Sequence, residues 1–128
     1  MSRKYKLRPK RIRDENGEEK VLYYPISVAV STFTTDEIAK EISDASSLTE
    51  SDVSGALKAF STIIIQKLRY GHNVKLDGIG TFSLSVRGEG VENPEDFKAS
   101  MVRVGKVAFK SDIKLRESLE DTKFNKVD

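Results

Sequence analysis

The stretch from Val74 to Val86 constrains the fold most, because it places two glycines between two runs of alternating apolar residues. Side chains of a strand alternate between its faces, so the pattern predicts two short antiparallel strands, each with one apolar face. Asp77-Gly78-Ile79-Gly80 lies between them, and Asp-Gly is a strong turn signal. The second glycine permits either a positive φ or a close approach by another backbone segment. The exposed N–H groups of such a turn either bind a phosphate or belong to a simple strand connection.

The composition excludes several classes of protein. With 128 residues, 38% of them hydrophobic, the chain has the size of one domain with a modest core. It contains no cysteine, and His72, expected in a turn, is the only histidine, which leaves no disulfide framework and no structural zinc site. The aliphatic run at residues 63–65 is too short to cross a bilayer, and no signal-peptide pattern follows the basic start. We therefore expect a cytoplasmic protein with no cofactor, metal, membrane or small-molecule ligand.

Positive charge is concentrated at the N-terminal end. Seven of the 22 basic residues lie within residues 1–13, the basic leader, which has no acidic residue. The other 115 residues therefore carry 15 basic against 20 acidic side chains. Such a block suits attraction to a polyanion, although basic termini are also common as solvated segments. Its basic residues are Arg3, Lys4, Lys6, Arg8, Lys10, Arg11 and Arg13.

Residues 1–32 are predicted to form a β-hairpin. Asn16-Gly17 marks its turn, because this dipeptide readily takes the two positive φ values of a type I′ turn. Pro25 lies in the second strand and supplies no N–H, so we expect this strand at a sheet edge or at a bulge. The apolar face of that strand comprises Leu22, Tyr24, Ile26, Val28 and Val30.

Two helices are predicted next. A capping box from Thr34 to Glu37, with Phe33 stapled onto Ile38, starts the first helix. The same arrangement recurs at residues 48–53 and predicts a second helix from near Glu50 to Tyr70, ahead of Gly71. The apolar stripe of the second helix is Val53, Ala56, Leu57, Phe60, Ile64 and Leu68. Ile63 and Ile65 add apolar surface that either a subunit interface or burial within a monomer would explain.

The C-terminal third is predicted to form a strand and a helix. Residues 102–109 alternate as in a strand, with a bulge expected at Gly105. Ser111 is expected to cap a short helix that has Asp112 in its first turn and ends near Asp121. Residues 122–128 are expected to form a tail anchored by Phe124 and Val127.

The order of these elements resembles the HU and integration-host-factor family. The match is carried by Val74-Lys75-Leu76, Gly78-Ile79-Gly80-Thr81-Phe82 and Ala108-Phe109-Lys110, and it covers residues 33–121. The leading hairpin and the run at residues 89–100 indicate a diverged, HU-related branch. The resemblance implies one α+β domain over residues 1–128, with an HU-like helix pair, an antiparallel sheet, an N-terminal hairpin and a short C-terminal helix. It also implies an intertwined homodimer that binds and bends double-stranded DNA with two β-arms.

The predicted arm departs from the pattern of that family, whose arm is strongly basic and inserts a proline between base pairs. Residues 87–100 carry Arg87 and Lys98 against four acidic side chains, a net charge of −2. Asn93-Pro94, followed by two carboxylates, is typical of a helix start, with proline at the first position. This interpretation predicts a short helix in place of the ribbon, so the wedge mechanism cannot simply be carried over.

The sequence therefore predicts a non-enzymatic, nucleoid-associated protein that binds duplex DNA with weak sequence preference and marked salt sensitivity. The main alternative is an HU-fold scaffold that binds proteins instead of DNA. An enzyme is a distant third, because no constellation of catalytic side chains is present. The predicted DNA contacts are the seven cations of the basic leader together with Lys75, Gly78, Gly80, Thr81, Arg87, Lys106 and Lys110.

Overall fold

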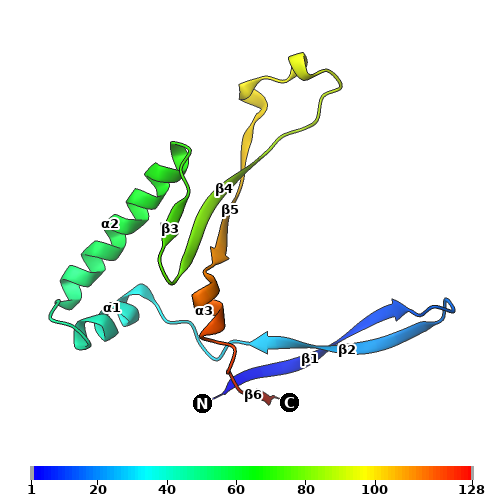
Figure 1. The fold of residues 1–128 in the computed structure, drawn as a ribbon, viewed down its shortest axis with the longest axis horizontal. Helices are drawn as coiled ribbons and strands as arrows, with labels where there is room; N and C mark the ends of the chain where they lie inside the picture. The colour runs from blue at the N-terminus through cyan, green and yellow to red at the C-terminus, as the bar shows by residue number, and fades with distance from the viewer. Residues whose placement is uncertain (1, 128) are drawn as a thin grey trace. The chain divides into compact units, whose positions relative to one another are not determined.

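The computed structural model describes residues 2–127 and divides the chain into two compact units (Figure 1). Unit 1 comprises the residues up to Thr34 together with those from Glu120 onward, and unit 2 spans Thr35–Leu119. Each unit contains one three-stranded sheet, and the helices belong to unit 2, so the fold is α+β as expected. Whether the two units unfold together as one domain of 128 residues stays a prediction.

Unit 1 is a three-stranded sheet with the order β2-β1-β6. β1 (Arg3–Arg13) and β2 (Glu19–Val28) form the predicted hairpin, and the predicted edge position of Pro25 on β2 is confirmed. The tail contributes β6 (Phe124–Lys126), which the sequence did not indicate and which runs parallel to the first residues of β1. Because β6 pairs only with Arg3 to Tyr5, most of β1 has a partner on one side alone.

The turn of this hairpin differs from the predicted type I′ turn. Gly17 has φ +77°, but among the described residues no non-glycine residue has positive φ, so Asn16 does not adopt the second left-handed conformation. Instead, Gly17 N–H donates to the Asp14 carbonyl at 3.0 Å, and the Asp14 carboxylate accepts from the N–H groups of Asn16 and Glu18. A type I turn followed by a left-handed glycine is the usual three-residue hairpin loop. The aspartate side chain stabilises it as an Asx-turn.

Unit 2 begins with two helices, α1 (Thr35–Asp44) and α2 (Glu50–Arg69). The Thr49 hydroxyl accepts from Asp52 N–H at 3.1 Å, which confirms the predicted start of α2. At the other end Gly71 has φ +94°, and the N–H groups of Gly71 and His72 donate to carbonyls of the last turn. This pair of bonds is a Schellman motif, and it ends the helix where the sequence predicted.

The sheet of unit 2 has the order β3-β4-β5, with β3 (Val74–Leu76), β4 (Gly80–Arg87) and β5 (Arg103–Ser111), and α2 packs against β3 and β4. The two glycines before β4 have different roles. Gly78 supplies a positive φ of +77° in the turn, whereas Gly80 is buried against β5. A Cβ atom at position 80 would lie 2.6 Å from the Phe109 ring and would also clash with the Lys110 carbonyl. The predicted close approach of another backbone segment is therefore confirmed at Gly80.

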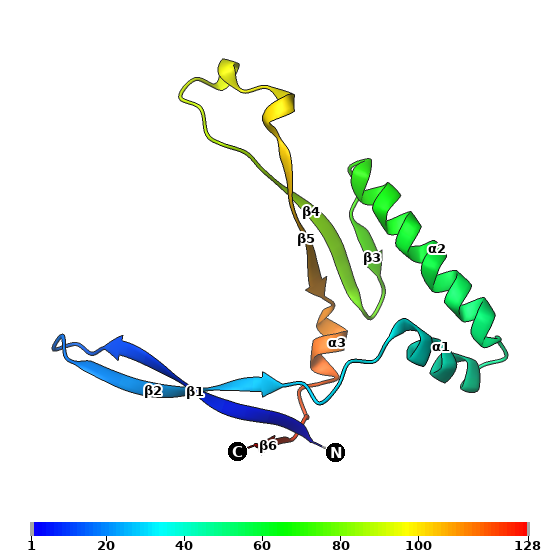
Figure 2. The same cartoon turned by 180° about the vertical axis from the view of Figure 1, so that it is seen from behind.

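β4 and β5 continue beyond β3 as a two-stranded ribbon (Figures 1 and 2). Its register shifts between Leu84 and Val86, where Gly105 and Lys106 lie opposite Ser85 and confirm the predicted bulge. The Ser85 hydroxyl accepts from Lys106 N–H at 3.0 Å and donates to the Lys106 carbonyl at 3.3 Å. A bulge of this kind bends the strand and increases its twist.

The loop at the end of the ribbon holds two 3₁₀-turns, Pro94–Asp96 and Ala99–Met101. Pro94 occupies the first position of its turn, as predicted, although the Asn93 side chain makes no capping hydrogen bond. The helix does not replace the ribbon. The ribbon persists to the pair Arg87 and Arg103, and the helical turns form only its tip.

The C-terminal helix α3 (Ile113–Glu117) is shorter than predicted and starts one residue later. Ser111 is the last residue of β5, and Asp112 is the N-cap, whose Oδ1 accepts from Lys114 N–H at 3.0 Å. The other oxygen of Asp112 accepts from Gly78 N–H at 3.1 Å, and Asp112 N–H donates to the Ile79 carbonyl. One side chain therefore joins the β3–β4 turn to the start of α3, which explains why aspartate and not serine caps this helix.

The apolar core is small. Among residues 2–127 the buried apolar side chains are Ala39, Val53 and Leu68, all on the helices of unit 2. A folded monomer of 14.3 kDa exposes roughly 6,800 Å², whereas this chain exposes 11300 Å². Ile63 and Ile65 remain 46% and 52% exposed, and Val86 and Val104 of the ribbon are 67% and 63% exposed. Full burial within a monomer, the simpler interpretation of these isoleucines, is therefore excluded.

Candidate nucleic-acid interface

The sheet of unit 2 has one apolar and one basic face. Residues paired across strands lie on the same face. One face therefore carries the row Val74, Phe82 and Phe109, whose two rings lie 5.1 Å apart. The other carries the row Lys75, Thr81 and Lys110, continuing to the pair Arg87 and Arg103. We call the second surface the ribbon face; its cations are Lys75, Lys110, Arg87 and Arg103, with Lys106 in the bulge opposite Ser85.

All five cations of the ribbon face are exposed, and the strand residues between them bear no acidic side chain. The structure thus brings together four predicted cations from distant parts of the chain, with Thr81 between Lys75 and Lys110. A phosphate backbone presents negative charge at regular intervals, and a row of exposed cations matches it without reading the bases.

Arg103 is a fifth cation that sequence reasoning missed. It lies directly opposite Arg87 at the end of the ribbon, where the two line a hollow of about 530 Å³ with Gly88, Glu89, Ser100 and Met101. Like charges directly opposite each other destabilise a sheet, so this pair has a structural cost. The signal is invisible in the sequence because the bulge at Gly105 decides which residue faces Arg87.

The turn residues Gly78 and Gly80 have shown structural roles, and their contact with DNA stays a prediction. Gly78 N–H already donates to Asp112 and Ile79 N–H to the Leu76 carbonyl, so neither amide is open to a phosphate in this conformation. The N–H groups of Lys114 and Gly78, with the nearby charge of Lys75, hold the pKa of Asp112 below its ordinary value. The N–H group of Gly78 in this turn thus binds the carboxylate of Asp112, the same kind of anionic group that a phosphate would offer.

The basic leader is strand β1 and not a flexible tail. Because strand side chains alternate, it presents Lys4, Lys6, Arg8 and Lys10 on one face and Arg3, Arg11 and Arg13 on the other. The first set lies beside the predicted apolar row of β2, for Lys6 pairs with Ile26 and Arg8 with Tyr24. The predicted apolar face of β2 is therefore half of a mixed basic and apolar surface, which we call the lysine face.

A negative tip ends the ribbon. Glu89, Glu92, Glu95 and Asp96 lie in the loop between β4 and β5, beyond the arginine pair. The cations of the ribbon face are thus followed, along the same ribbon, by a segment that phosphates repel.

Comparison with known proteins finds a family pattern that covers both units of the chain. The sequence profile of HU-HIG, described as an HU domain fused to wHTH, Ig, or Glycine-rich motif, matches residues 1–126. The chain belongs to the HU-HIG family. The match includes the N-terminal hairpin, so that segment is part of the HU-HIG pattern, and the predicted relation to an HU branch with an extra hairpin is confirmed.

Two solved structures share the fold of the HU-HIG chain. One, described as a bacterial DNA-binding protein from Bacteroides vulgatus ATCC 8482, matches with a TM-score of 0.66 and 14% identity over 98% of this chain. That match covers 48% of the Bacteroides protein, so the HU-HIG chain spans about half its length. The other is an Anabaena HU–DNA cocrystal structure, with a TM-score of 0.53 and 21% identity over 70% of this chain and 99% of the HU chain. Among curated proteins no relative matches the sequence.

A helix able to span a membrane is not found within residues 2–127 of the HU-HIG chain.

Proposed function

We propose that this HU-HIG chain is a non-enzymatic, nucleoid-associated protein that binds duplex DNA as a homodimer with weak sequence preference. The observation that carries the proposal is the ribbon face, where five exposed cations share the polar side of one sheet. The Anabaena HU chain, crystallised with DNA, has the same fold over its whole length.

The lysine face of β1 is proposed as a second phosphate contact. Residues two apart on a strand are separated by about 6.6 Å, so Lys4, Lys6, Arg8 and Lys10 form an evenly spaced row. Neutralising several phosphates releases condensed counterions, which makes the affinity steeply salt-dependent. Because these contacts reach the backbone and not the base edges, they predict little discrimination between sequences.

The proposed homodimer accounts for the unburied apolar surface of unit 2. The chain exposes far more surface than a folded monomer of its mass, and the exposed apolar side chains include Ile63 and Ile65 of α2 and Val86 and Val104 of the ribbon. Obligate dimers bury several thousand Å² of such surface. Association through these faces leaves the five cations of the ribbon face on the opposite side of the sheet.

The test is fluorescence anisotropy of a labelled, mixed-sequence duplex titrated with the intact chain at several salt concentrations. The variant Lys75→Gln/Lys106→Gln/Lys110→Gln removes three charges from the ribbon face. If each lysine contacts one phosphate, the slope of log affinity against log salt becomes shallower by about 2 to 3. The matched control replaces three exposed lysines of the helices, in Lys40→Gln/Lys58→Gln/Lys67→Gln, and is expected to leave the slope nearly unchanged.

A second variant, Lys4→Gln/Lys6→Gln/Lys10→Gln, tests the lysine face. Deleting residues 1–13 would be a poorer experiment, because β1 is the central strand of its sheet and its loss would remove the partner of both β2 and β6. Equal salt slopes for the ribbon-face and helix triple variants would contradict the proposed interface. Absence of duplex binding even at low salt would favour the alternative function, a scaffold whose acidic tip binds a protein.

A further inference from the structure

The sheet of unit 1 has a second face, opposite the lysine face, that neither the duplex contact nor the proposed dimer uses. By strand alternation it carries Tyr5, Leu7, Tyr23 and Pro25, and β6 adds Phe124. We call it the aromatic face. Tyr23 and Phe124 are 64% and 59% exposed, and large apolar rings gathered on one exposed surface are typical of an interaction site.

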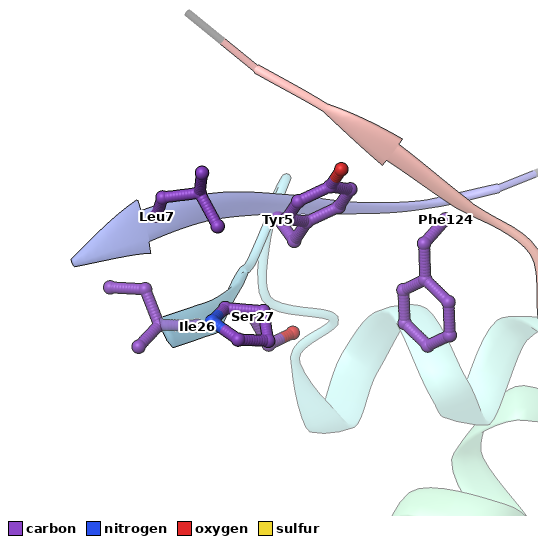
Figure 3. A pocket seen from close by; sticks show the side chains of 6 residues that line it. Tyr5, Leu7, Ile26, Ser27 and Phe124 are labelled. Atoms are coloured by element: carbon purple, nitrogen blue, oxygen red, sulfur yellow. The ribbon is translucent and has the colours of Figure 1, made fainter. Parts of the chain in front are cut away.

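A hollow of about 620 Å³ lies on this face, and its lining is almost wholly apolar. Figure 3 shows Tyr5 and Leu7 on β1, Phe124 on β6 and Ser27 on β2 around it. Ile26, whose position in the strand belongs to the lysine face, also reaches the lining. The Ser27 hydroxyl accepts from Arg3 Nε at 2.7 Å, and the phenol hydroxyl of Tyr5 is the other polar side-chain group of the lining. The hollow therefore offers stacking and apolar contact and hardly any hydrogen bonding.

Cations surround the aromatic rings. Arg3 is held beside the hollow by Ser27, Lys126 pairs with Tyr5 across β1 and β6, and Arg11 and Arg13 continue the same face along β1. The acidic residues of the hairpin are gathered near its turn, where Glu19 lies on this face opposite Arg13. The others are Asp14, Glu15 and Glu18.

This charge pattern restricts the occupant. A second copy of the chain would bring its own cations against these, which like-charge repulsion opposes. A DNA duplex satisfies the cations, but its stacked bases cannot lie flat on a tyrosine or phenylalanine ring. An unpaired strand satisfies both, because its phosphates meet the arginines while its bases stack on exposed aromatic rings. For a ribose 2′-hydroxyl, the group by which proteins select RNA, the side chains of the lining offer the two hydroxyls of Tyr5 and Ser27, whereas the other lining side chains are apolar.

We infer that the aromatic face binds single-stranded DNA, with bases stacked on Tyr23, Phe124 and Tyr5 and phosphates bound by the surrounding arginines. This activity is independent of the duplex contact through the lysine and ribbon faces. The chain then holds paired and unpaired DNA on different surfaces, as a protein acting where duplexes open requires.

The experiment measures affinity of the full chain for a labelled oligothymidylate of about 12 nucleotides, within the range that one such sheet covers. An oligouridylate and a duplex of equal length serve as the comparison probes. Tyr23→Ala and Phe124→Ala are each expected to weaken oligothymidylate binding about 5-fold or more, while duplex binding changes less than about 2-fold at constant charge. Bound thymidylate should also quench tyrosine fluorescence, since the chain contains no tryptophan.

The matched control is Tyr24→Ala, which removes the neighbouring ring from the opposite face. It is expected to leave oligothymidylate affinity unchanged, and circular dichroism of all three variants checks that the sheet is intact. The inference is overturned if Tyr24→Ala weakens single-strand binding as much as Tyr23→Ala, or if the aromatic variants bind like the parent. Tighter binding of oligouridylate, or loss of self-association in Phe124→Ala with no change in thymidylate affinity, would overturn it equally. If the single-strand inference is overturned but the chain still binds duplex DNA, the proposed function is unaffected.

Discussion

The two units use similar ribbons but stabilise them differently. In unit 2 the ribbon is fixed by close backbone approach at Gly80, by the serine-bonded bulge at Gly105 and by Asp112, which ties its turn to α3. In unit 1 the hairpin depends on an Asx-stabilised loop and on three residues of β6, and it has no buried side chain among those described. Both ribbons nevertheless carry a row of cations, on the ribbon face of unit 2 and on the lysine face of unit 1.

This difference indicates a division of roles. The register of unit 2 is set by the close backbone approach at Gly80 and by the bonded bulge at Gly105, which suits an element that must align cations from three strands. Unit 1 presents two faces of one exposed sheet, and its register is set mainly by a loop of ordinary hairpin geometry. Unit 2 is thus expected to be sensitive to single backbone changes that unit 1 tolerates, and the variants below test this in order of effect.

The largest effect is expected for Gly80→Val. Any Cβ at this position meets the Phe109 ring at 2.6 Å and the backbone of β5, which cannot move without breaking the ladder. Overpacking of this kind, with displacement of a central pairing, is expected to lower the free energy of unfolding by about 3 kcal/mol or more. Urea unfolding followed by circular dichroism measures it. Gly55→Ala is the control, because nothing lies near that glycine within α2, and a gain of about 0.5–1 kcal/mol is expected.

The next largest effect concerns the association of unit 2. Ile63→Glu places a charge on the unburied part of α2, where a monomer accepts it in water but a dimer would bury it unpaired. Light scattering is expected to give about twice 14.3 kDa for the parent and a mass near the monomer for the variant. The dissociation constant is expected to rise about 100-fold. Ser61→Glu, which places the same charge on the side of the helix opposite Ile63, is the control, and equal dissociation of both variants would contradict this interface.

Local signals account for the parts of the fold that the sequence predicted. The threonine cap and Gly71 define α2, and the glycine-rich turns define two hairpins, because these features need only neighbouring residues. β6 escaped prediction because its parallel pairing joins Phe124 to Arg3, and three residues are too few to show alternation. Arg103 and the bridging role of Asp112 escaped for the same reason, since both depend on which strands meet. The sequence predicted which cations would contact DNA, but only the structure shows that they lie in two separate units.

A smaller effect is expected from the carboxylate that joins the turn of unit 2 to α3. Its pKa is depressed by the N–H groups of Lys114 and Gly78, so its charged form stabilises the fold. This contribution is present above the ordinary value of 3.8 and is lost as the pH falls through the lower folded-state value. Asp112→Asn should therefore lower the melting temperature at pH 7, and the difference from the parent should narrow at about pH 2. Asp77→Asn, which removes the neighbouring charge of the same turn, controls for the general effect of lost charge.

The smallest effect on DNA binding is expected at the tip of the ribbon. It tests whether unit 2, like unit 1, contacts DNA only through cations on the face of its sheet. If unit 2 acted as a wedge, Pro94 would be its inserting residue, and unit 1 would have no counterpart. Pro94 instead starts a 3₁₀-turn among four carboxylates, which are repelled by the phosphates on either side of a groove. Pro94→Ala is therefore expected to leave duplex affinity and the bend angle, measured by energy transfer between the ends of a labelled duplex, unchanged within error.

Glu92→Gln/Glu95→Gln is the companion variant, and it should strengthen duplex binding at low salt by reducing the repulsion between the tip and the phosphates. A reduced bend in Pro94→Ala would show that the tip enters the groove despite its charge, and the two units would then act on DNA in different ways.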